Sequence, residues 1–584
     1  MKNYLLISLG HNSSAIFVDN TNLKQQEIIG YEQERISGIK ADSQFPRDAI
    51  NEILKHVNPD KVKNCKVLIS HWFNFGPHEL PNKYMTQNDI DWLHYICGSD
   101  ITMCNRDFTH HDAHAYSAYE FFKYNTGIGS DVKGPIACLV VDGFGNNEEV
   151  LSLYSTDELK GIHLVHRVYG YTGSLGLMYQ YATSFVGMKE NQDEYKFLGY
   201  EAYIDEVLNE EQIDVLDHYV DITKDTFLKW FSEHTSRGKL PADKIIDYDA
   251  LKQLKKEWYK SFESVLEEFD MHETSSFNSR VVIAYLIQHI CENTLVAWLN
   301  ENYDIQNLIV VGGVFYNVKL NQTLREKCAK KLFSVMPLAG DQGAAIGMYA
   351  KDCDRQFEFR DLCWGKRKLY NAEKLVNNLS DKFPVKYLKL TTHDELEEIK
   401  QHIAMLISNN NIVNLVIGNM EFGPRALCHT STLFLPTSEN VHCNNMINGR
   451  NEVMPCAPVC TRENAYELFD AQSLEKTIGS DKYMICTHTY TKPFSSHYGG
   501  IMHKKPIEYS FTGRPQIVDK PEFMYDILKA VEEITDYKAL VNTSFNVHGR
   551  PIAFDIISIL QNYEYQYEHA DINKKPHLII IETE

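Results

Sequence analysis

Residues 4–18 read YLLISLGHNSSAIFV, two short apolar runs separated by the polar stretch His11-Asn12-Ser13-Ser14. Apolar runs on either side of a polar turn predict a β-hairpin with His11 at its tip. A second unit of this kind begins with CLVVDGFGN at 138–146 and continues with LSLYS at 151–155. The chain is therefore expected to contain two hairpins, each led by a buried apolar strand.

Paired hairpins of this kind are typical of the duplicated nucleotide-binding fold of actin and the sugar kinases, the ASKHA fold, whose turns aim backbone N–H groups at phosphates. The pattern predicts that fold, although a plain β-sandwich would also contain apolar hairpins. Two later stretches are NLIVVGGVFYN at 307–317, a buried strand broken by Gly312-Gly313, and PLAGDQGAAIGMYA at 337–350, which leads from Asp341 into a helix of small residues. Both permit a nucleotide to approach the backbone, and a tight turn for packing would use the same glycines.

The length of the chain predicts more than one domain, because 584 residues that are 43% hydrophobic exceed what a single core usually holds. The periodic pattern breaks at 351–366. We therefore expect an N-terminal actin-like domain at 1–355, with a helical insertion at about 205–275, and a C-terminal α/β domain at 367–584. Within the C-terminal domain the pattern predicts helices at 392–410 and 521–535 and strands near 431–436 and 483–487.

Composition excludes several classes of protein. The formal charge of -21 argues against a surface that grips nucleic acid generally through its phosphates, since such surfaces rely on clustered Lys and Arg. Thirteen scattered cysteines without a CxxC pair indicate a reduced, cytoplasmic protein without a structural zinc knuckle. The first apolar run stops at Gly10, too early for a signal peptide, and no uninterrupted apolar stretch approaches the ~18–20 residues of a membrane helix. We expect a soluble protein.

A pair of histidines suggests a metal site. His110 and His114 are four residues apart in a stretch, THHDAHAYSAYEFF, that predicts an α-helix. That spacing places both imidazoles on one helix face, where they can bind a single metal ion. The chain has 24 histidines, so a close pair also arises by chance. The pair becomes a site only if other segments supply further ligands.

Nine stretches, taken in order, resemble the O-carbamoyltransferase family, which includes the carbamoyltransferases of nodulation factors and of antibiotic tailoring. One stretch alone would be weak, but nine in one order extend from the first strand to residue 552. They are GHNSSA at 10–15, EQERISGIKADSQFP at 32–46, HHDAHA at 110–115, VDG at 141–143, SLGLMY at 174–179, GGVFYN at 312–317, GDQGAAIG at 340–347, EFGPRAL at 421–427 and NTSFNVHGRPI at 542–552.

The resemblance implies an N-terminal domain similar to the metalloprotein that makes threonylcarbamoyl-adenosine in tRNA, and a YrdC-like C-terminal domain. In that family the C-terminal domain joins carbamoyl phosphate to ATP to give carbamoyl-adenylate, and the N-terminal domain moves the carbamoyl group to a hydroxyl. ATP, with Mg²⁺, and carbamoyl phosphate are therefore the expected substrates. The resemblance leaves a homodimer open.

Transfer from an adenylate needs a base for the acceptor hydroxyl and a cation for the developing negative charge. By resemblance, His110, His114 and Asp341, with Asp142 as a fourth ligand, hold an iron-type divalent metal. Imidazoles with carboxylates also suit zinc. The alternative for both aspartates is a carboxylate that caps a helix or forms a turn.

His11 is the residue that the resemblance implies as the general base, since an imidazole can accept a proton near neutral pH. The alternative is a turn residue that bonds its own backbone. His111 points to another side of the helix and is expected to be structural. The residues expected to contact ATP or the adenylate lie in turns and after strands: Ser13, Gly143, Gly312, Gly313, Asn317 and Gly340.

Carbamoyl phosphate is a small dianion, which a forked guanidinium holds better than an ammonium. Arg425 in EFGPRAL is the first candidate and Arg450 the second, although either could form a surface salt bridge instead. The amide and hydroxyl groups of Asn542, Thr543 and Ser544 are expected to assist.

Several positions depart from the family pattern. After Arg-Ala-Leu the family usually continues with Gly-Asn-Arg-Ser, whereas this chain has Cys428-His429-Thr430-Ser431, so one customary arginine is absent. Met454 stands where another arginine is usual, and Arg550 replaces a common acid. We expect a rebuilt phosphate pocket in which Arg550 or Arg462 compensates.

Two alternatives come from other functional classes. A threonylcarbamoyl-type tRNA enzyme would share the N-terminal chemistry but should lack the fused C-terminal motifs. A non-catalytic ATP-binding module of the actin-like fold would need the hairpins but not the paired histidines. The acceptor is expected to be a natural-product sugar or other small molecule, or a hydroxymethylated pyrimidine in phage-type DNA.

Overall fold

Both predicted hairpins form. In a computed structural model of the chain, β1 (Tyr4–Ser8) pairs antiparallel with β2 (Ser14–Asp19), and every residue of these two strands is buried. The second hairpin pairs β6 (Ile136–Val141) with β7 (Glu149–Thr156). The structure describes residues 2–73, 84–98, 100–127, 132–156, 161–236, 246–367, 369–390, 392–450, 456–492, 496–505, 510–572 and 574–583.

The two hairpins open two sheets with the same strand order. The first sheet runs β3-β2-β1-β4-β5, in which β3 (Glu27–Glu32) extends the hairpin and β4 (Lys66–Ser70) and β5 (Ile101–Met103) follow in parallel. The second runs β8-β7-β6-β10-β11 with the same directions, and a short β9 (Thr235–Ser236) extends it beyond β8. Its remaining strands are β8 (His163–Tyr169), β10 (Asn307–Val311) and β11 (Leu332–Val335). This repeated order confirms the duplicated actin-like fold.

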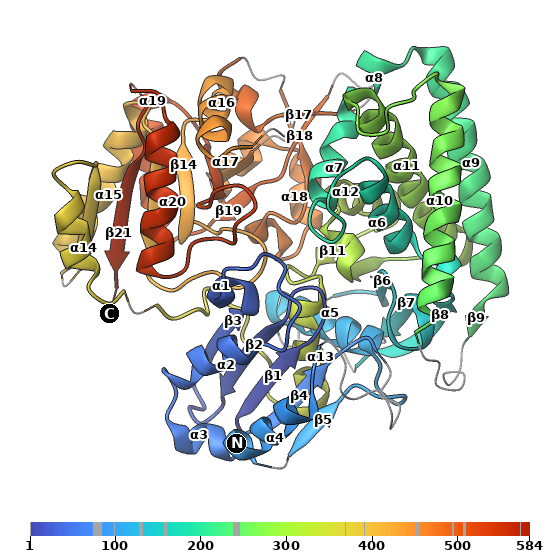
Figure 1. The fold of residues 1–584 in the computed structure, drawn as a ribbon, viewed down its shortest axis with the longest axis horizontal. Coiled ribbons are helices and arrows are strands. Elements are labelled where there is room, and N and C mark those ends of the chain that lie inside the picture. The colour runs from blue at the N-terminus through green and yellow to red at the C-terminus, as the bar shows by residue number, and fades with distance from the viewer. Residues whose placement is uncertain are drawn as a thin grey trace.

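Helices cover these two sheets and form a lobe of their own beyond the second one (Figure 1). The long helices α9, α10 and α11 lie at the right of the view; α9 and α10 fall within the expected insertion at about 205–275, and α11 follows it. The helices are α1 (Gln33–Ser37), α2 (Arg47–Leu54), α3 (Pro59–Lys63), α4 (Gln87–Cys97), α5 (His110–Thr126), α6 (Leu175–Phe185), α7 (Glu194–Phe197), α8 (Ile204–Val207), α9 (Glu210–Glu233), α10 (Tyr248–Glu268), α11 (Phe277–Asn302), α12 (Val318–Lys327) and α13 (Ala344–Asp352). Short 3-10 helices are η1 (Asn146–Glu148), η2 (Tyr171–Gly173), η3 (Leu198–Tyr203), η4 (Gly313–Tyr316) and η5 (Asp341–Gly343).

The helix α11 is long and apolar enough to cross a membrane, but 72% of its most apolar window is buried inside the protein. It packs against α6, α9 and α12. It is therefore a core helix of the N-terminal half, which we define as residues 2–352.

The C-terminal half, residues 369–583, is an α/β unit built on one mixed sheet of order β12-β21-β13-β14-β20-β15-β19, with a small sheet β16-β18-β17 beside it. Its strands are β12 (Val385–Lys389), β13 (Val413–Ile417), β14 (Thr430–Phe434), β15 (Ala457–Thr461), β16 (His488–Thr489), β17 (His503–Lys504), β18 (Phe511–Gly513), β19 (Gln516–Val518), β20 (Leu540–Ser544) and β21 (His577–Glu582). Its helices are α14 (Ala372–Leu379), α15 (His393–Ser408), α16 (Ser438–Ile447), α17 (Arg462–Leu468), α18 (Ala471–Lys476), α19 (Phe523–Thr535) and α20 (Ile556–His569), with η6 (Ser480–Tyr483) and η7 (Ser496–Ile501).

The structure agrees with most of the elements predicted in this half and corrects one. The predicted helices at 392–410 and 521–535 correspond to α15 and α19, and the strand near 431–436 to β14. The strand predicted at 483–487 is wrong, because η6 ends at Tyr483 and Met484 adopts a left-handed conformation (φ 52°) that no extended strand contains.

The segment that joins the halves is packed into the core rather than loose. Phe357, Phe359 and Trp364 are 0%, 0% and 4% exposed, and the Trp364 ring lies 5.1 Å from that of Phe422. The Phe357 N–H also donates to the Glu120 carboxylate at 2.9 Å. We retain 1–355 and 367–584 as the proposed domain division, with this buried segment between them.

The close approach of α5 and α13 depends on one glycine. A Cβ on Gly347 would lie 1.7 Å from the carbonyl oxygen of Ala113 in α5, so no larger residue fits without separating the helices. We predict that Gly347→Ala lowers the free energy of unfolding by about 1–3 kcal/mol through overpacking. Urea unfolding measures this, with the exposed Lys351→Ala in the same helix as the control; equal effects of the two changes would contradict the packing constraint.

Candidate functional site

The helix α5 carries the paired histidines at its first turn. Thr109 caps this helix in a capping box with Asp112. The second hairpin also fixes the N-terminus of α5. The side chains of Asn146 and Glu149 accept hydrogen bonds from the N–H groups of His110 and His111, at 2.7 and 3.1 Å respectively. Anchored in this way, His110 and His114 lie one turn apart with their Nε2 atoms 3.0 Å from each other.

Two aspartates from the ends of strands complete the cluster. Asp142 directly follows β6, and Asp341 opens η5 after β11. Glycines give both side chains room: a Cβ on Gly10 would lie 1.8 Å from Asp341 Oδ2, and one on Gly313 would lie 3.0 Å from Asp142 Oδ1. The duplicated fold therefore brings the four predicted metal ligands together.

The geometry of the four side chains fits one divalent metal ion. The carboxylate of Asp142 lies 3.3 Å from His110 Nε2 and 3.4 Å from His114 Nε2, and that of Asp341 lies 3.3 and 3.8 Å from the same atoms. The four ligand atoms all lie within 4.8 Å of one another. An ion bound at about 2.0–2.2 Å from each donor would occupy their centre, and two imidazoles with two carboxylates are donors that iron and zinc accept.

Opposite charges compensate one another in this buried cluster. Burial lowers the pKa of His110, but hydrogen bonds to Asp142 and Asp341 raise it to about 10. Burial raises the pKa of each aspartate, yet the two imidazoles hold both pKa values below their usual range. The side chains of Asp142 and Asp341 are 15% and 11% exposed, so they form the side of the cluster that opens outward.

His111 takes no part in the cluster. Its Nδ1 lies 2.8 Å from the Ser152 hydroxyl, and burial together with the Arg167 guanidinium lowers its pKa well below the usual value. Arg167 in turn pairs with Asp112 at 2.7 Å and with Glu149 at 3.2 Å. This position agrees with the expectation that His111 is structural.

His11 lies at the tip of the first hairpin and is exposed. Its backbone N–H points to Asp341 Oδ2 at 3.4 Å, and its ring is stacked on Trp72 with the centroids 6.1 Å apart. The imidazole is therefore placed beside the cluster, with its edge accessible.

A cavity of ≈ 500 Å³ extends from this cluster into the C-terminal half; we call it the shared cavity. Of the residues predicted for the N-terminal chemistry, its wall contains His11, Asp142, Gly143, Gly313, Asn317, Gly340 and Asp341. All five residues predicted for carbamoyl phosphate also line it: Arg425, Arg450, Asn542, Thr543 and Ser544. Ser13 and Gly312 are buried behind the wall.

Three arginines face the C-terminal end of the shared cavity. Arg450 donates to the Thr543 hydroxyl at 2.9 Å and lies 3.4 Å from that of Ser544. Arg425 and Arg514 form no ion pair with a described residue, and Arg425 Nε is buried without a hydrogen-bond partner. Burial lowers the pKa of both, and the Arg425 guanidinium lowers that of Arg514 further. Two guanidinium groups that line one cavity without a carboxylate partner among the described residues favour an anion there.

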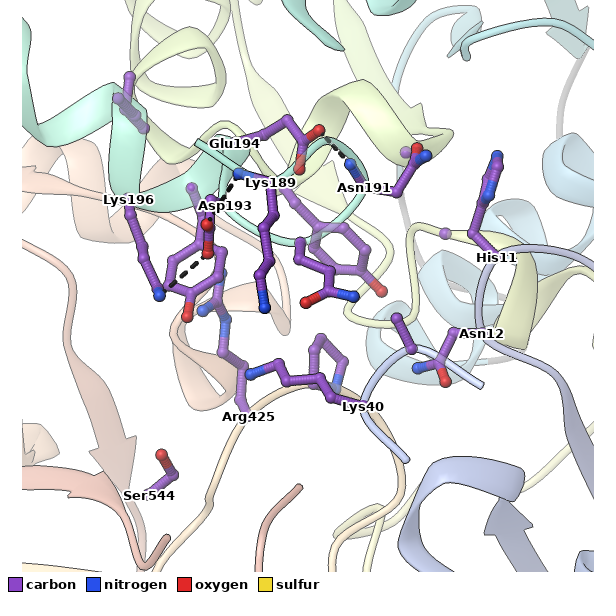
Figure 2. Close-up of a pocket in the computed structure, with 18 of the residues that line it drawn as sticks. His11, Asn12, Lys40, Lys189, Asn191, Asp193, Glu194, Lys196, Arg425 and Ser544 are labelled. Carbon is purple, nitrogen blue, oxygen red and sulfur yellow. Dashed lines mark hydrogen bonds and ion pairs between the residues drawn. The ribbon is translucent and has the colours of Figure 1, made fainter. Parts of the chain in front are cut away.

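Arg514 and a segment of the N-terminal half, residues 188–196, were not predicted from the sequence. Figure 2 shows Lys189 and Lys40 extending from the N-terminal half toward Arg425. Tyr195, in α7 at the end of this segment, lies under the Arg425 guanidinium at 5.7 Å. Only the cluster of charged residues MKENQDEYK could have drawn attention to this segment, and it has no fixed spacing.

The loop that carries Arg425 is shaped by one buried carboxylate. Glu421 accepts hydrogen bonds from the N–H groups of Leu427, His429 and Thr430, at 2.8, 2.9 and 2.8 Å. Cys428 within this loop has φ 70°, the left-handed conformation that glycine adopts without strain. That conformation explains why a glycine is usual where this chain has Cys428.

Of the two arginines expected to compensate, Arg462 is already held in ion pairs with Asp481 and Asp519, at 2.6 and 2.7 Å. Arg550 is exposed between the wall residues Gly549 and Pro551, and its role stays a prediction. Thr430 is fully buried and bonds Glu421 instead of facing the cavity. Arg514, which belongs to none of the nine stretches, lines the cavity, while Met454 lies outside the described residues.

Residues 5–350 match the family model described as Carbamoyltransferase N-terminus, and residues 404–569 match Carbamoyltransferase C-terminus. The chain belongs to the carbamoyltransferase family. This carbamoyltransferase is therefore a transferase, and the alternative of a non-catalytic ATP-binding module is not retained. Both of its halves match domains of the same family, which also disfavours a threonylcarbamoyl-type tRNA enzyme.

The relatives of this carbamoyltransferase include Uncharacterized protein MJ1051 of Methanocaldococcus jannaschii, which is 28% identical over 93% of both chains. Nodulation protein NolNO of Sinorhizobium fredii is 22% identical over 95% of this chain and 76% of its own length. Nodulation protein U of the same species is 29% identical over 42% of this chain and 40% of its own.

Two solved structures are similar to parts of the chain at low identity. Component A of (R)-2-hydroxyglutaryl-CoA dehydratase from Acidaminococcus fermentans is 10% identical, with a TM-score of 0.31, and covers 60% of this chain and 97% of its own. HypF of T. kodakarensis is 13% identical, with a TM-score of 0.29, over 60% of this chain and 47% of its own.

His114, a proposed metal ligand, and His111, which lies outside the cluster, provide a matched test of the metal site. Changes next to metal ligands already cost about 10- to 100-fold in affinity, so His114→Asn should lower bound metal at least that much. His111→Asn should retain it, because His111 faces Ser152. Elemental mass spectrometry measures the metal content per chain after loading with Fe²⁺ or Zn²⁺. An equal loss of bound metal in both variants would refute the cluster as the binding site.

Proposed function

We propose that the chain is an ATP-dependent O-carbamoyltransferase that makes carbamoyl-adenylate in its C-terminal half and transfers the carbamoyl group to an acceptor hydroxyl in its N-terminal half. The observation that carries this proposal is the shared cavity, whose wall contains Asp142 and Asp341 at one end and Arg425, Arg450 and Arg514 at the other. A small anionic intermediate can pass between these ends without leaving the protein.

In the first half-reaction carbamoyl phosphate, ATP and water give carbamoyl-adenylate, phosphate and pyrophosphate. Arg425 and Arg514 have no carboxylate partner among the described residues, so their N–H groups are available to phosphate oxygens. Arg450 is oriented by Thr543, and Asn542 fixes the Arg425 loop by donating to the Ala426 carbonyl at 3.0 Å. These contacts position the anions before the bond to the α-phosphate forms.

In the second half-reaction the acceptor oxygen attacks the carbamoyl carbon, the bond to AMP breaks, and the hydroxyl proton moves to a base. His11 is the proposed base, and its position in the cavity wall beside Asp341 supports this role. The backbone at Gly143, Gly313 and Gly340 lines the same end and leaves room for the nucleotide.

A divalent metal, proposed to be iron, would be held by His110, His114, Asp142 and Asp341 and would supply positive charge to the AMP phosphate and the developing oxyanion. Mg²⁺ is proposed to accompany ATP. The acceptor is proposed to be a hydroxylated small molecule such as a natural-product sugar, with hydroxymethylated pyrimidine in DNA as the second class to test.

The proposal is tested by supplying carbamoyl phosphate and ATP to the purified protein. We expect pyrophosphate release that requires carbamoyl phosphate, and a mass gain of one carbamoyl group on a member of a panel of sugars, amino sugars and hydroxymethylated DNA. Pyrophosphate release that ignores carbamoyl phosphate would refute the first half-reaction.

The two half-reactions should respond to different variants. His11→Ala should reduce transfer to the acceptor by about 10²–10⁴-fold, the usual contribution of a general base, and leave pyrophosphate release intact. Arg425→Ala should reduce pyrophosphate release by about 10²–10³-fold, since it removes a charged donor to the reacting anions. Both activities, pyrophosphate release and transfer to the acceptor, are measured in both variants. An equal loss of the two activities in His11→Ala would contradict the assignment of His11 as the base.

A further inference from the structure

A buried ion cluster lies where the first sheet meets the C-terminal half. Glu32 ends β3, and Glu34 and Arg35 lie in α1. The side chains of Glu32 and Arg35 are 0% and 3% exposed, and the Arg35 guanidinium lies 3.0 Å from Glu32 and 3.2 Å from Glu34. One guanidinium thus faces two carboxylates, whose other oxygens need further donors.

Those donors come from both ends of the shared cavity. Glu32 Oε1 accepts a hydrogen bond from the side-chain amide of Asn12 at 2.7 Å, and Glu32 Oε2 accepts one from the Gly423 N–H at 3.2 Å. Arg35 returns a bond to the Gly423 carbonyl at 2.7 Å. Asn12 follows His11 at the hairpin tip, and Gly423 lies two residues before Arg425. One carboxylate therefore joins the turn of His11 to the loop of Arg425.

The same cluster fixes a third segment of the wall. Glu34 accepts a hydrogen bond from the Ala41 N–H at 2.8 Å, which holds the loop that carries Lys40. Asn12, Lys40, Ala41 and Arg425 all line the shared cavity. Glu32 itself is buried behind the wall, so it acts through these neighbours.

We infer that Glu32 is a positioning residue that fixes the turn of His11 relative to the loop of Arg425, so that carbamoyl-adenylate reaches His11 without release to solvent. This inference rests on the proposed function. Misplacement of reacting groups by about 1 Å costs up to about 100-fold in rate, which is why a residue outside the wall can control transfer.

The variant Glu32→Gln tests positioning at constant side-chain volume, and the loss of a buried negative charge is matched by the control variant below. A glutamine amide has the shape of the carboxylate and can still accept a hydrogen bond from Asn12, but its NH₂ group then faces the Gly423 N–H and Arg35, which are also donors. The hydrogen bond between residue 32 and the Gly423 N–H is lost, while no residue that lines the cavity is changed.

The test forms carbamoyl-adenylate from radiolabelled carbamoyl phosphate and ATP without an acceptor, and rapid filtration measures how fast it leaves the protein. We expect Glu32→Gln to release the adenylate at least about tenfold faster than the parent chain, with the single-turnover yield of pyrophosphate unchanged. Asn12→Ala, which leaves the Glu32–Arg35 pair intact, should also release it faster and serves if Glu32→Gln does not fold.

The matched control is Asp89→Asn. Asp89 is a buried carboxylate that belongs, like Glu32, to the N-terminal half. It is paired with Arg47 at 2.7 Å and lies outside the cavity wall. Release no faster from Glu32→Gln and Asn12→Ala than from Asp89→Asn would overturn the inference while leaving the proposed function in place. Absence of carbamoyl-phosphate-dependent pyrophosphate from the parent chain would instead remove both.

Discussion

The mutual compensation of two carboxylates and two imidazoles, with all four ligand atoms within 4.8 Å, constrains the whole N-terminal half. Buried carboxylates are stable only beside positive charge, so the segments that carry Asp142 and Asp341 must meet the first turn of α5. Gly10 and Gly347 permit this approach, because a Cβ on either would lie within 1.8 Å of an atom of a neighbouring segment. The second sheet supplies the scaffold, since Asp142 directly follows β6 and Asp341 comes after β11.

The shared cavity has a different electrostatic character from the rest of the molecule. The chain carries a formal charge of -21, yet Arg425 and Arg514, which form no ion pair with a described residue, both line the cavity. Burial lowers the pKa of both guanidinium groups, and Arg425 lowers the pKa of Arg514 further. This end of the cavity is therefore better suited to an anion than to a neutral solute.

Much of the fold and part of the site follow from the sequence. His110 and His114 lie in a single helix, and each hairpin is formed by strands that are consecutive in the sequence. Short stretches of sequence therefore suffice to predict both features. Asp142 and Asp341 needed the family resemblance, because only the fold brings their strands together. Arg514 could not be foreseen, since it belongs to no motif. Arg462 misled because its partners, Asp481 and Asp519, are distant in sequence and become neighbours only on folding. Which loops meet across a cavity is long-range information that a single sequence does not display.

The buried segment between the halves opposes encoding the two halves as separate proteins. Phe357, Phe359 and Trp364 are buried in the core of the N-terminal half, and Trp364 packs on Phe422 of the C-terminal half. A gene split at this segment would expose a large aromatic surface on each product, and such surfaces promote aggregation. Continuity of the polypeptide therefore ensures that each N-terminal half is made together with one C-terminal half, whatever the level of expression.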